Sequence, residues 1–201
     1  MANLLLTERC VRSCPYCFAQ SQMVVADGPP LLSWENLIYV ADFLEAANHS
    51  HISLLGGEPT LHPQFLDFAL YLIERRFSVH VFTSGIMPDR TLEDLLARLR
   101  DISSEQIAFI CNLNDPRQTQ SGANEWARVE QFLDVFGPRI TAGFNIYRTD
   151  FELGFLFQLI NQYGLQRHLR LGLANPIFNG NNAFVRPEDI GGIVNRVFSY
   201  R

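Results

Sequence analysis

The stretch HISLLGGEPT, residues 51–60, shows the unit from which this chain is built. Its first half, His51–Leu55, is almost continuously apolar, which is typical of a strand in a parallel sheet with both faces covered. Its second half is a turn with two adjacent glycines and an acidic residue. An apolar strand followed by a polar loop is the arrangement that α/β folds use to place functional residues at the carboxyl end of a strand.

The same unit recurs along the chain. Apolar segments that we predict to be strands lie at residues 3–7, 79–83, 107–112, 140–147 and 169–173, in addition to 51–55. Chemically useful residues follow these segments rather than precede them, and the clearest cases are three cysteines after the first and a Thr-Ser-Gly turn after the third. We therefore expect the functional residues to share one rim of the fold.

Segments with the apolar periodicity of helices lie between the predicted strands. Ser33 is a candidate N-cap for the first helix, and Pro187 is a candidate first residue for the last one. Thr149 and Glu152 have the spacing of a capping box ahead of a helix over residues 151–162. Further helices are predicted at 92–99 and 126–136. Successive strand–helix units predict a parallel α/β fold, either an open doubly wound sheet or a barrel-like ring.

Composition limits the class of protein. The 201 residues are 47% hydrophobic and 18% charged with a net charge of -5, so we predict one globular domain over residues 1–201. The charge does not indicate nucleic-acid binding, and no apolar run is long enough to span a membrane. The N-terminus lacks the features of a signal peptide, so we expect a cytoplasmic protein. In that reducing setting, clustered cysteines favour metal binding or catalysis over disulfides.

Three of the four cysteines lie in ERCVRSCPYCF, residues 8–18. Cys14 and Cys17 alone would suit a redox dithiol, but Cys10 has no role in that chemistry. A zinc site would need a fourth ligand, for which His62 is the candidate on the predicted rim. An iron–sulfur cluster accepts three thiolates and leaves one iron open for another ligand. The residues leave all three kinds of site open.

The spacing Cys10-x-x-x-Cys14-x-x-Cys17, with an aromatic residue before the last cysteine, resembles the signature of the radical S-adenosylmethionine (radical SAM) superfamily. The sequence GGEPT after the second predicted strand is similar to the Gly-Gly-Glu motif of the same superfamily, and the resemblance covers residues 3–176. It implies a partial (β/α)6 TIM-like barrel of parallel strands with its active site at the carboxyl ends of the strands. Members of the superfamily often add a C-terminal domain that holds additional clusters, and because no cysteine follows Cys111 we expect residues 1–201 to be the core domain without it. The resemblance further implies an oxidoreductase in which the three thiolates hold a [4Fe–4S] cluster. The open iron of that cluster binds SAM, whose reductive cleavage yields a 5′-deoxyadenosyl radical that abstracts hydrogen.

The resemblance also assigns roles around SAM. It places the adenine beside the backbone of Tyr16 and the methionyl amino group beside Gly56 and Gly57. Glu58 either binds SAM or braces its loop through a salt bridge, and Ser84 either reaches a SAM oxygen or caps the turn that follows it. The full set of implied SAM-binding residues is Tyr16, Gly56, Gly57, Glu58, Pro59, Ser84, Asn112, Arg148 and Leu173.

Two of these positions carry particular expectations. Arg148 is expected to bind the SAM carboxylate, with a helix-start or surface arginine as the alternative, and the backbone at Leu173 is expected to meet the adenine. Asn114 stands where peptide-modifying members have an aspartate, which puts a copied catalytic role there in doubt. Cys111, inside the fourth predicted strand, is expected to be a buried structural thiol. No catalytic residue beyond the cluster and SAM is predicted.

The resemblance leaves the substrate open. A peptide or protein substrate is the leading expectation. The alternatives are an activase for a glycyl-radical enzyme, a small-molecule-modifying enzyme, a non-catalytic iron–sulfur electron-transfer protein and, least favoured, a structural zinc protein. The chemistry implies a one-electron donor of the flavodoxin or ferredoxin type as a partner.

Overall fold

The computed structural model describes residues 2–17, 19, 31–115, 124–174 and 185–200. Six strands form one parallel sheet in the order β1-β2-β3-β4-β5-β6, so every strand pairs with its neighbours in sequence. The strands are β1 (Ala2–Leu5), β2 (His51–Leu55), β3 (Ser78–Thr83), β4 (Ile107–Asn112), β5 (Ile140–Ile146) and β6 (Leu169–Leu173). β1 and β6 are the two edges of this sheet. The prediction of a partial, TIM-like α/β ring is confirmed.

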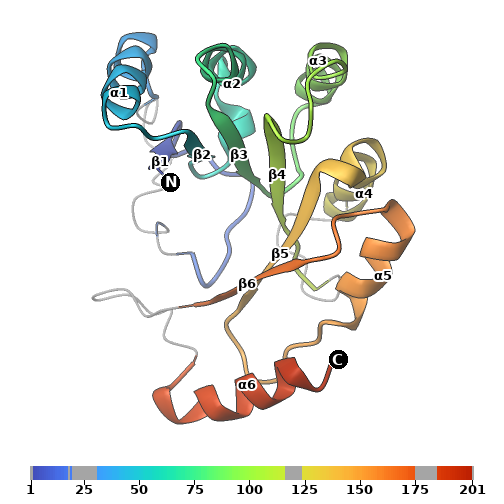
Figure 1. The fold of residues 1–201 in the computed structure, drawn as a ribbon. Helices are drawn as coiled ribbons and strands as arrows, with labels where there is room; N and C mark the ends of the chain where they lie inside the picture. The colour runs from blue at the N-terminus through green and yellow to red at the C-terminus, as the bar shows by residue number, and fades with distance from the viewer. Residues whose placement is uncertain (1, 18, 20–30, 116–123, 175–184, 201) are drawn as a thin grey trace.

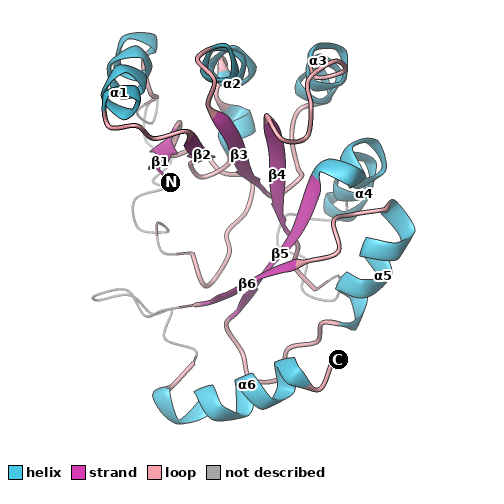
Figure 2. Ribbon diagram, viewed as in Figure 1, coloured by secondary structure: helices cyan, strands magenta, loops and turns pink. Residues whose placement is uncertain are grey.

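Helices cover the outer face of the curved sheet (Figures 1 and 2). They are α1 (Trp34–Ala46), α2 (Phe65–Glu74), α3 (Asp89–Arg98), α4 (Glu125–Phe136), α5 (Gly154–Tyr163) and α6 (Ile190–Phe198). Short 3-10 turns precede α2, β5 and α6, at Pro59–Leu61, Gly137–Arg139 and Pro187–Asp189. Within the described part of the chain, no helix is both long and apolar enough to cross a membrane.

The core lies between the outer face of the sheet and the helices. Side chains alternate between the two faces of a strand, and in β4 the buried residues Ile107, Phe109 and Cys111 alternate with half-buried ones. The ring of Phe109 lies 5.2 Å from that of Phe132 in α4, which identifies this as the helix-covered face. Cys111 is fully buried here, as predicted for a structural thiol. The inner face of β3 and β4 is only half-buried, so the prediction of full cover on both faces is wrong for these two strands.

Two of the predicted helix starts are confirmed. The backbone N–H of Asn36 donates to Ser33 Oγ (3.2 Å), so Ser33 caps α1. Pro187 begins the 3-10 turn that leads directly into α6.

The capping box at Thr149 and Glu152 is not formed. The side chain of Glu152 instead accepts hydrogen bonds from Arg196 and from the hydroxyl of Tyr200, and α5 begins only at Gly154. β1 also ends at Leu5, two residues before the predicted end. Thr7 forms an antiparallel bridge with Leu31, so the chain leaves the parallel ladder there.

Candidate functional site

The loops after β1 and β2 are joined through their backbones. The N–H of Gly57 donates to the carbonyl of Thr7 (2.8 Å), and the N–H of Glu58 donates to the carbonyl of Arg9 (2.7 Å). A Cβ atom at Gly56 would lie 2.5 Å from the oxygen of Thr7, and one at Gly57 would lie 2.2 Å from the oxygen of Arg9. The two glycines are therefore required by the close approach of the cysteine-bearing backbone. Their approach to a methionyl amino group stays a prediction.

Glu58 is a buried carboxylate with hydrogen-bond donors on both oxygens. Glu58 is only 1% exposed. Its Oε1 accepts hydrogen bonds from the hydroxyls of Thr60 (2.8 Å) and Thr83 (2.8 Å). Ser84 donates its backbone N–H (2.7 Å) and its hydroxyl (2.6 Å) to Oε2. No arginine or lysine among the described residues pairs with it. Glu58 thus braces its loop against the end of β3, as one of the two alternatives predicted, but with hydroxyl and amide donors in place of a salt bridge.

The hydroxyl of Ser84 takes part in this bracing. It donates its proton to Glu58 and accepts a hydrogen bond from the backbone N–H of Ile86 (3.2 Å). The turn-capping alternative is therefore confirmed. Contact of Ser84 with a SAM oxygen stays a prediction, and a donating contact would require the hydroxyl to leave Glu58.

Arg12 fixes the cysteine loop from the opposite side. Its Nε–H donates to Glu125 Oε1 (2.8 Å), and its Nη1 donates to the carbonyl of Asn112 (2.7 Å) at the end of β4. Its Nη2 lies 2.7 Å from the same carboxylate oxygen, with side chains 3% and 2% exposed. Neither Arg12 nor Glu125 was among the predicted site residues. The buried ion pair ties the cysteine loop to the first turn of α4.

The three cysteines of this loop are partly buried and lie close enough for the charge of one thiolate to raise the pKa of another. Burial, together with the nearby Glu58, Cys14 and Cys17, raises the pKa of Cys10 to about 11. The pKa of Cys14 is also raised, chiefly by burial, although Tyr16 and Arg12 act in the opposite direction. Thiolates in this environment need a cation to neutralise them, and a metal supplies that charge.

The donor set fits a cluster better than a single metal ion. Within the described residues, no three His, Cys, Asp or Glu side chains are placed to hold one metal. Both ring nitrogens of His62, the candidate fourth zinc ligand, have structural partners: Nδ1 lies 3.1 Å from the N–H of Gln64 and Nε2 lies 3.1 Å from the carbonyl of Leu32. Three thiols on one short loop, without a fourth protein ligand, match the ligand number that a cubane cluster with one open iron accepts.

Tyr16 is held against the ends of β4 and β5. Its hydroxyl donates to Asn114 Oδ1 (2.7 Å), and its ring centroid lies 4.9 Å from that of Tyr147. Asn114 Nδ2 and, nearby in sequence, Asn112 Oδ1 are buried and have no hydrogen-bond partner. Buried polar atoms without partners are rare, and a bound ligand would satisfy them. Sequence analysis missed Tyr147, although its position directly after β5 could have indicated it.

Comparison with known proteins decides the family. The model of the radical SAM superfamily matches residues 4–135, which include both the cysteine loop and the Gly-Gly-Glu loop. The chain belongs to the radical SAM superfamily. Its expected fold and its expected standing as an enzyme of this superfamily are thereby confirmed, and the family implies SAM and a [4Fe–4S] cluster.

The relatives of this radical SAM chain include enzymes with nucleotide substrates in their names. It is 30% identical over 107 residues to the mitochondrial GTP 3′,8-cyclase of Arabidopsis thaliana, covering 52% of this chain and 26% of that protein. It is 26% identical over 139 residues to an S-adenosylmethionine-dependent nucleotide dehydratase from a Thermoplasmatales archaeon (strain ISO4-H5), covering 67% and 46%. The chain therefore spans less than half of either relative.

Solved structures share the fold at low identity. Streptococcus suis SuiB bound to S-adenosylmethionine has a TM-score of 0.74 and 14% identity, with 99% of this chain and 47% of that chain covered. The structure of histidine-tagged anSMEcpe with bound AdoMet has a TM-score of 0.70 and 13% identity, with 99% and 57% covered. These likenesses extend the family fold to nearly the whole radical SAM chain.

Arg148 does not point to an open site in this structure. Two of its nitrogens donate to the carboxylate of Asp150, at 2.8 and 2.7 Å, and both side chains are largely exposed. These hydrogen bonds raise the pKa of Arg148 and lower that of Asp150. The surface-arginine alternative describes the observed contact. Binding of the SAM carboxylate stays a prediction that requires Arg148 to exchange partners. Leu173 is the last residue of β6 and is 38% exposed, and its contact with adenine also stays a prediction.

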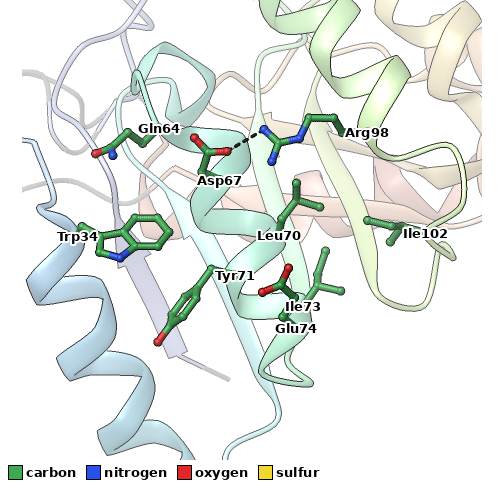
Figure 3. A pocket seen from close by; sticks show the side chains of 9 residues that line it. All are labelled: Trp34, Gln64, Asp67, Leu70, Tyr71, Ile73, Glu74, Arg98 and Ile102. Carbon is green, nitrogen blue, oxygen red and sulfur yellow. Dashed lines mark hydrogen bonds and ion pairs between the residues drawn. The ribbon is translucent and has the colours of Figure 1, made fainter.

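One groove on the molecule is unrelated to this rim. It has a volume of about 640 Å³ and lies on the outer side of the ring, against α1, α2 and α3 (Figure 3). Trp34 and Tyr71 lie on one side of it, and the Asp67–Arg98 ion pair (2.7 Å) lies at its rim. None of its lining residues comes from the carboxyl end of a strand, so we do not assign it to the superfamily's chemistry.

We predict that Glu58→Gln destabilises the fold through the hydrogen bonds of its carboxylate. A glutamine presents an NH₂ group to donors that now meet an oxygen, and the free energy of unfolding should fall by about 2 kcal/mol or more. Urea denaturation monitored by circular dichroism measures this change. Glu93→Gln, an exposed substitution in α3, is the control and should stay within about 0.5 kcal/mol of wild type. Equal stability of the two variants would contradict the bracing role of Glu58.

A second prediction concerns the buried Arg12–Glu125 pair. Glu125→Ala leaves a buried guanidinium without its counter-ion and should cost about 3–5 kcal/mol of unfolding free energy. Adding Arg12→Met removes the stranded charge, so the double variant should be more stable than Glu125→Ala alone. A double-mutant cycle by urea denaturation measures the coupling. Strictly additive effects would show that the two side chains do not depend on each other.

Proposed function

We propose that this chain is a radical SAM enzyme in which Cys10, Cys14 and Cys17 hold a [4Fe–4S] cluster and the rim of the sheet holds SAM. The observation that supports this most directly is the backbone pairing of Gly57 and Glu58 with the cysteine loop. It brings the two family motifs, which lie about 40 residues apart in the sequence, into one rigid unit. When bound, the cluster supplies the electron that cleaves SAM reductively to the hydrogen-abstracting 5′-deoxyadenosyl radical.

The residues of the chain have distinct parts in this proposal. Glu58 and Arg12 hold the two sides of the cysteine loop, so the thiols keep their spacing while a ligand is exchanged. Tyr16, supported by Tyr147 and Asn114, offers an aromatic surface and a fixed backbone beside the cysteines for adenine. Asn114 Nδ2, which has no hydrogen-bond partner, can donate to polar groups of SAM, and Asn112 Oδ1 can accept from them.

The proposed SAM site includes the remaining rim residues. Gly56, Gly57 and Pro59 shape the loop after β2. Ser84 directly follows β3, Arg148 lies two residues after β5, and Leu173 is the last residue of β6. We further propose that residues 1–201 act as a single core domain in the cytoplasm. A flavodoxin- or ferredoxin-type protein is the proposed source of the electron.

For the substrate, we propose a nucleotide or a nucleotide-like small molecule. The sequence alone favoured a peptide or protein. The support for a nucleotide is that relatives at 26–30% identity are named for reactions of GTP and of nucleotides. SuiB has been crystallised with its precursor peptide, but the 14% identity of that neighbour supports only a common fold. A peptide substrate and a glycyl-radical partner are therefore alternative outcomes of substrate tests.

Anaerobic reconstitution tests the proposed function. After reconstitution with iron and sulfide, the chain should hold about four irons and four sulfides, and reduction with dithionite should release 5′-deoxyadenosine from SAM. A full cluster without SAM cleavage would favour an electron-transfer protein. Zinc without sulfide would overturn the proposal in favour of a structural zinc site.

We predict that single cysteine substitutions separate the cluster ligands from the structural thiol. Cys14→Ala should abolish cluster binding because it removes one of three thiolates, and Cys10→Ala and Cys17→Ala should do the same. Cys111→Ala should keep a near-normal iron content because this thiol is fully buried in the helix-covered core. Iron and sulfide assays with the absorbance of the reconstituted cluster measure the difference. Equal losses at Cys14 and Cys111 would refute this division.

A further inference from the structure

The inner face of the sheet carries a single strongly basic or acidic side chain. Alternation along the strands, fixed by the helix-facing Val81, Phe109 and Phe144, identifies the residues that face inward. They are Asn3, Leu5, His51, Ser53, Leu55, Ser78, His80, Phe82, Ala108, Ile110, Asn112, Thr141, Gly143, Asn145, Arg170 and Gly172. The strands are fully described, and Arg170 is the one Arg, Lys, Asp or Glu in this set.

The side chain of Arg170 extends across the inner face. Arg170 pairs with Gly143 in β5, which pairs with Asn112 in β4. Its guanidinium carbon nevertheless lies 4.9 Å from the ring centroid of Phe82 in β3, three strands away from its own. An arginine can reach that ring only because the sheet curves inward at this point (Figure 1). A cation–π contact with the ring face holds the guanidinium on the inner side of the sheet, where Arg170 is exposed to solvent.

No carboxylate among the described residues neutralises Arg170. This distinguishes it from the other arginines near the rim: Arg12 pairs with Glu125, and Arg148 pairs with Asp150. A phenylalanine ring leaves the N–H groups at the edge of the guanidinium free, because they lie in the plane of the group and the ring covers only one face. Those N–H groups form the fork that matches an oxyanion.

Arg170 lies at a distance from the cysteine loop at which it could bind the end of a substrate that is remote from the cysteines. Its partner Gly143 is four residues before Tyr147, which contacts Tyr16 of that loop. At roughly 3.3 Å per residue, Gly143 and Tyr147 are about 13 Å apart along the direction of β5. A substrate anchored at Arg170 would extend from the interior toward the cysteines.

We propose that Arg170, held by Phe82, binds a phosphate group of the substrate, so that the substrate class is an anionic, phosphorylated nucleotide. The proposal rests on the proposed function, because it uses the direction toward the cysteine loop as the direction toward the chemistry. The unpaired fork fits any oxyanion, and phosphate is favoured over a carboxylate because the sequence relatives are named for nucleotide reactions. Arg170 is then a specificity-determining residue for binding and has no part in SAM cleavage.

The test measures binding of three probes to the reconstituted protein with SAM present: GTP, inorganic tripolyphosphate and guanosine. Isothermal titration calorimetry should show GTP and tripolyphosphate bound by wild type. Arg170→Gln should weaken both about tenfold to a hundredfold, as expected when one charged hydrogen-bonding partner is removed, and should leave the affinity for guanosine unchanged. Arg170→Lys should recover part of the loss because it restores the charge without the fork. Phe82→Leu should weaken GTP binding by a smaller factor.

Arg167→Gln is the matched control, since it removes an exposed arginine three residues earlier and outside the strand. It should bind all three probes like wild type. The proposal would be overturned if Arg170→Gln bound GTP like wild type, if Arg167→Gln caused an equal loss, or if wild type bound neither GTP nor tripolyphosphate. SAM cleavage without nucleotide, followed as 5′-deoxyadenosine, should persist in Arg170→Gln. Its absence from wild type would refute the proposed function separately from the phosphate site.

Discussion

The rim of this structure depends on how the carboxylate of Glu58 is buried. A carboxylate removed from water is costly unless donors replace its hydration, and here the donors come from Thr60, Thr83 and Ser84. These contacts fix the loop after β2 against the end of β3. The backbone N–H of Glu58 then holds the cysteine loop through the carbonyl of Arg9. One residue therefore sets the relative positions of three neighbouring loops.

The cysteine loop is fixed by a second and different interaction on its other side. The Arg12–Glu125 pair is buried, so its attraction is little screened, but its desolvation offsets much of that gain. Its value lies in geometry, because a guanidinium that also donates to the carbonyl of Asn112 permits few other loop positions. The cysteine loop is therefore held on one side by Glu58, whose carboxylate is hydrogen-bonded by hydroxyl and amide donors, and on the other by Glu125, whose carboxylate is paired with Arg12.

The parallel α/β class and the shared rim could be predicted from the sequence because each rests on local pattern, whereas the choice of a ring over an open sheet came from the family resemblance. The need for small residues at Gly56 and Gly57 was also visible, but which atoms approach them was not: Thr7 and Arg9 become neighbours only in the folded chain. The Arg12–Glu125 pair joins residues 113 apart, and no local signal connects them. The capping box predicted from Thr149 and Glu152 has the right local spacing but does not form. The carboxylate of Glu152 instead accepts hydrogen bonds from Arg196 and Tyr200, which are distant in sequence.

The inner wall shows why one arginine can determine what the site accepts. Asn112 Oδ1 lies 2.8 Å from where a Cβ of Gly143 would be, and Asn145 Oδ1 lies 2.4 Å from the corresponding position at Gly172. The two glycines thus let neutral amides lie flat against the neighbouring strands. Amides hydrogen-bond to many groups without selecting for charge. On this inner face of the sheet, Arg170 is therefore the residue that would distinguish anionic from neutral substrates. Its contact with the ring of Phe82 keeps its charge on the inner side of the sheet.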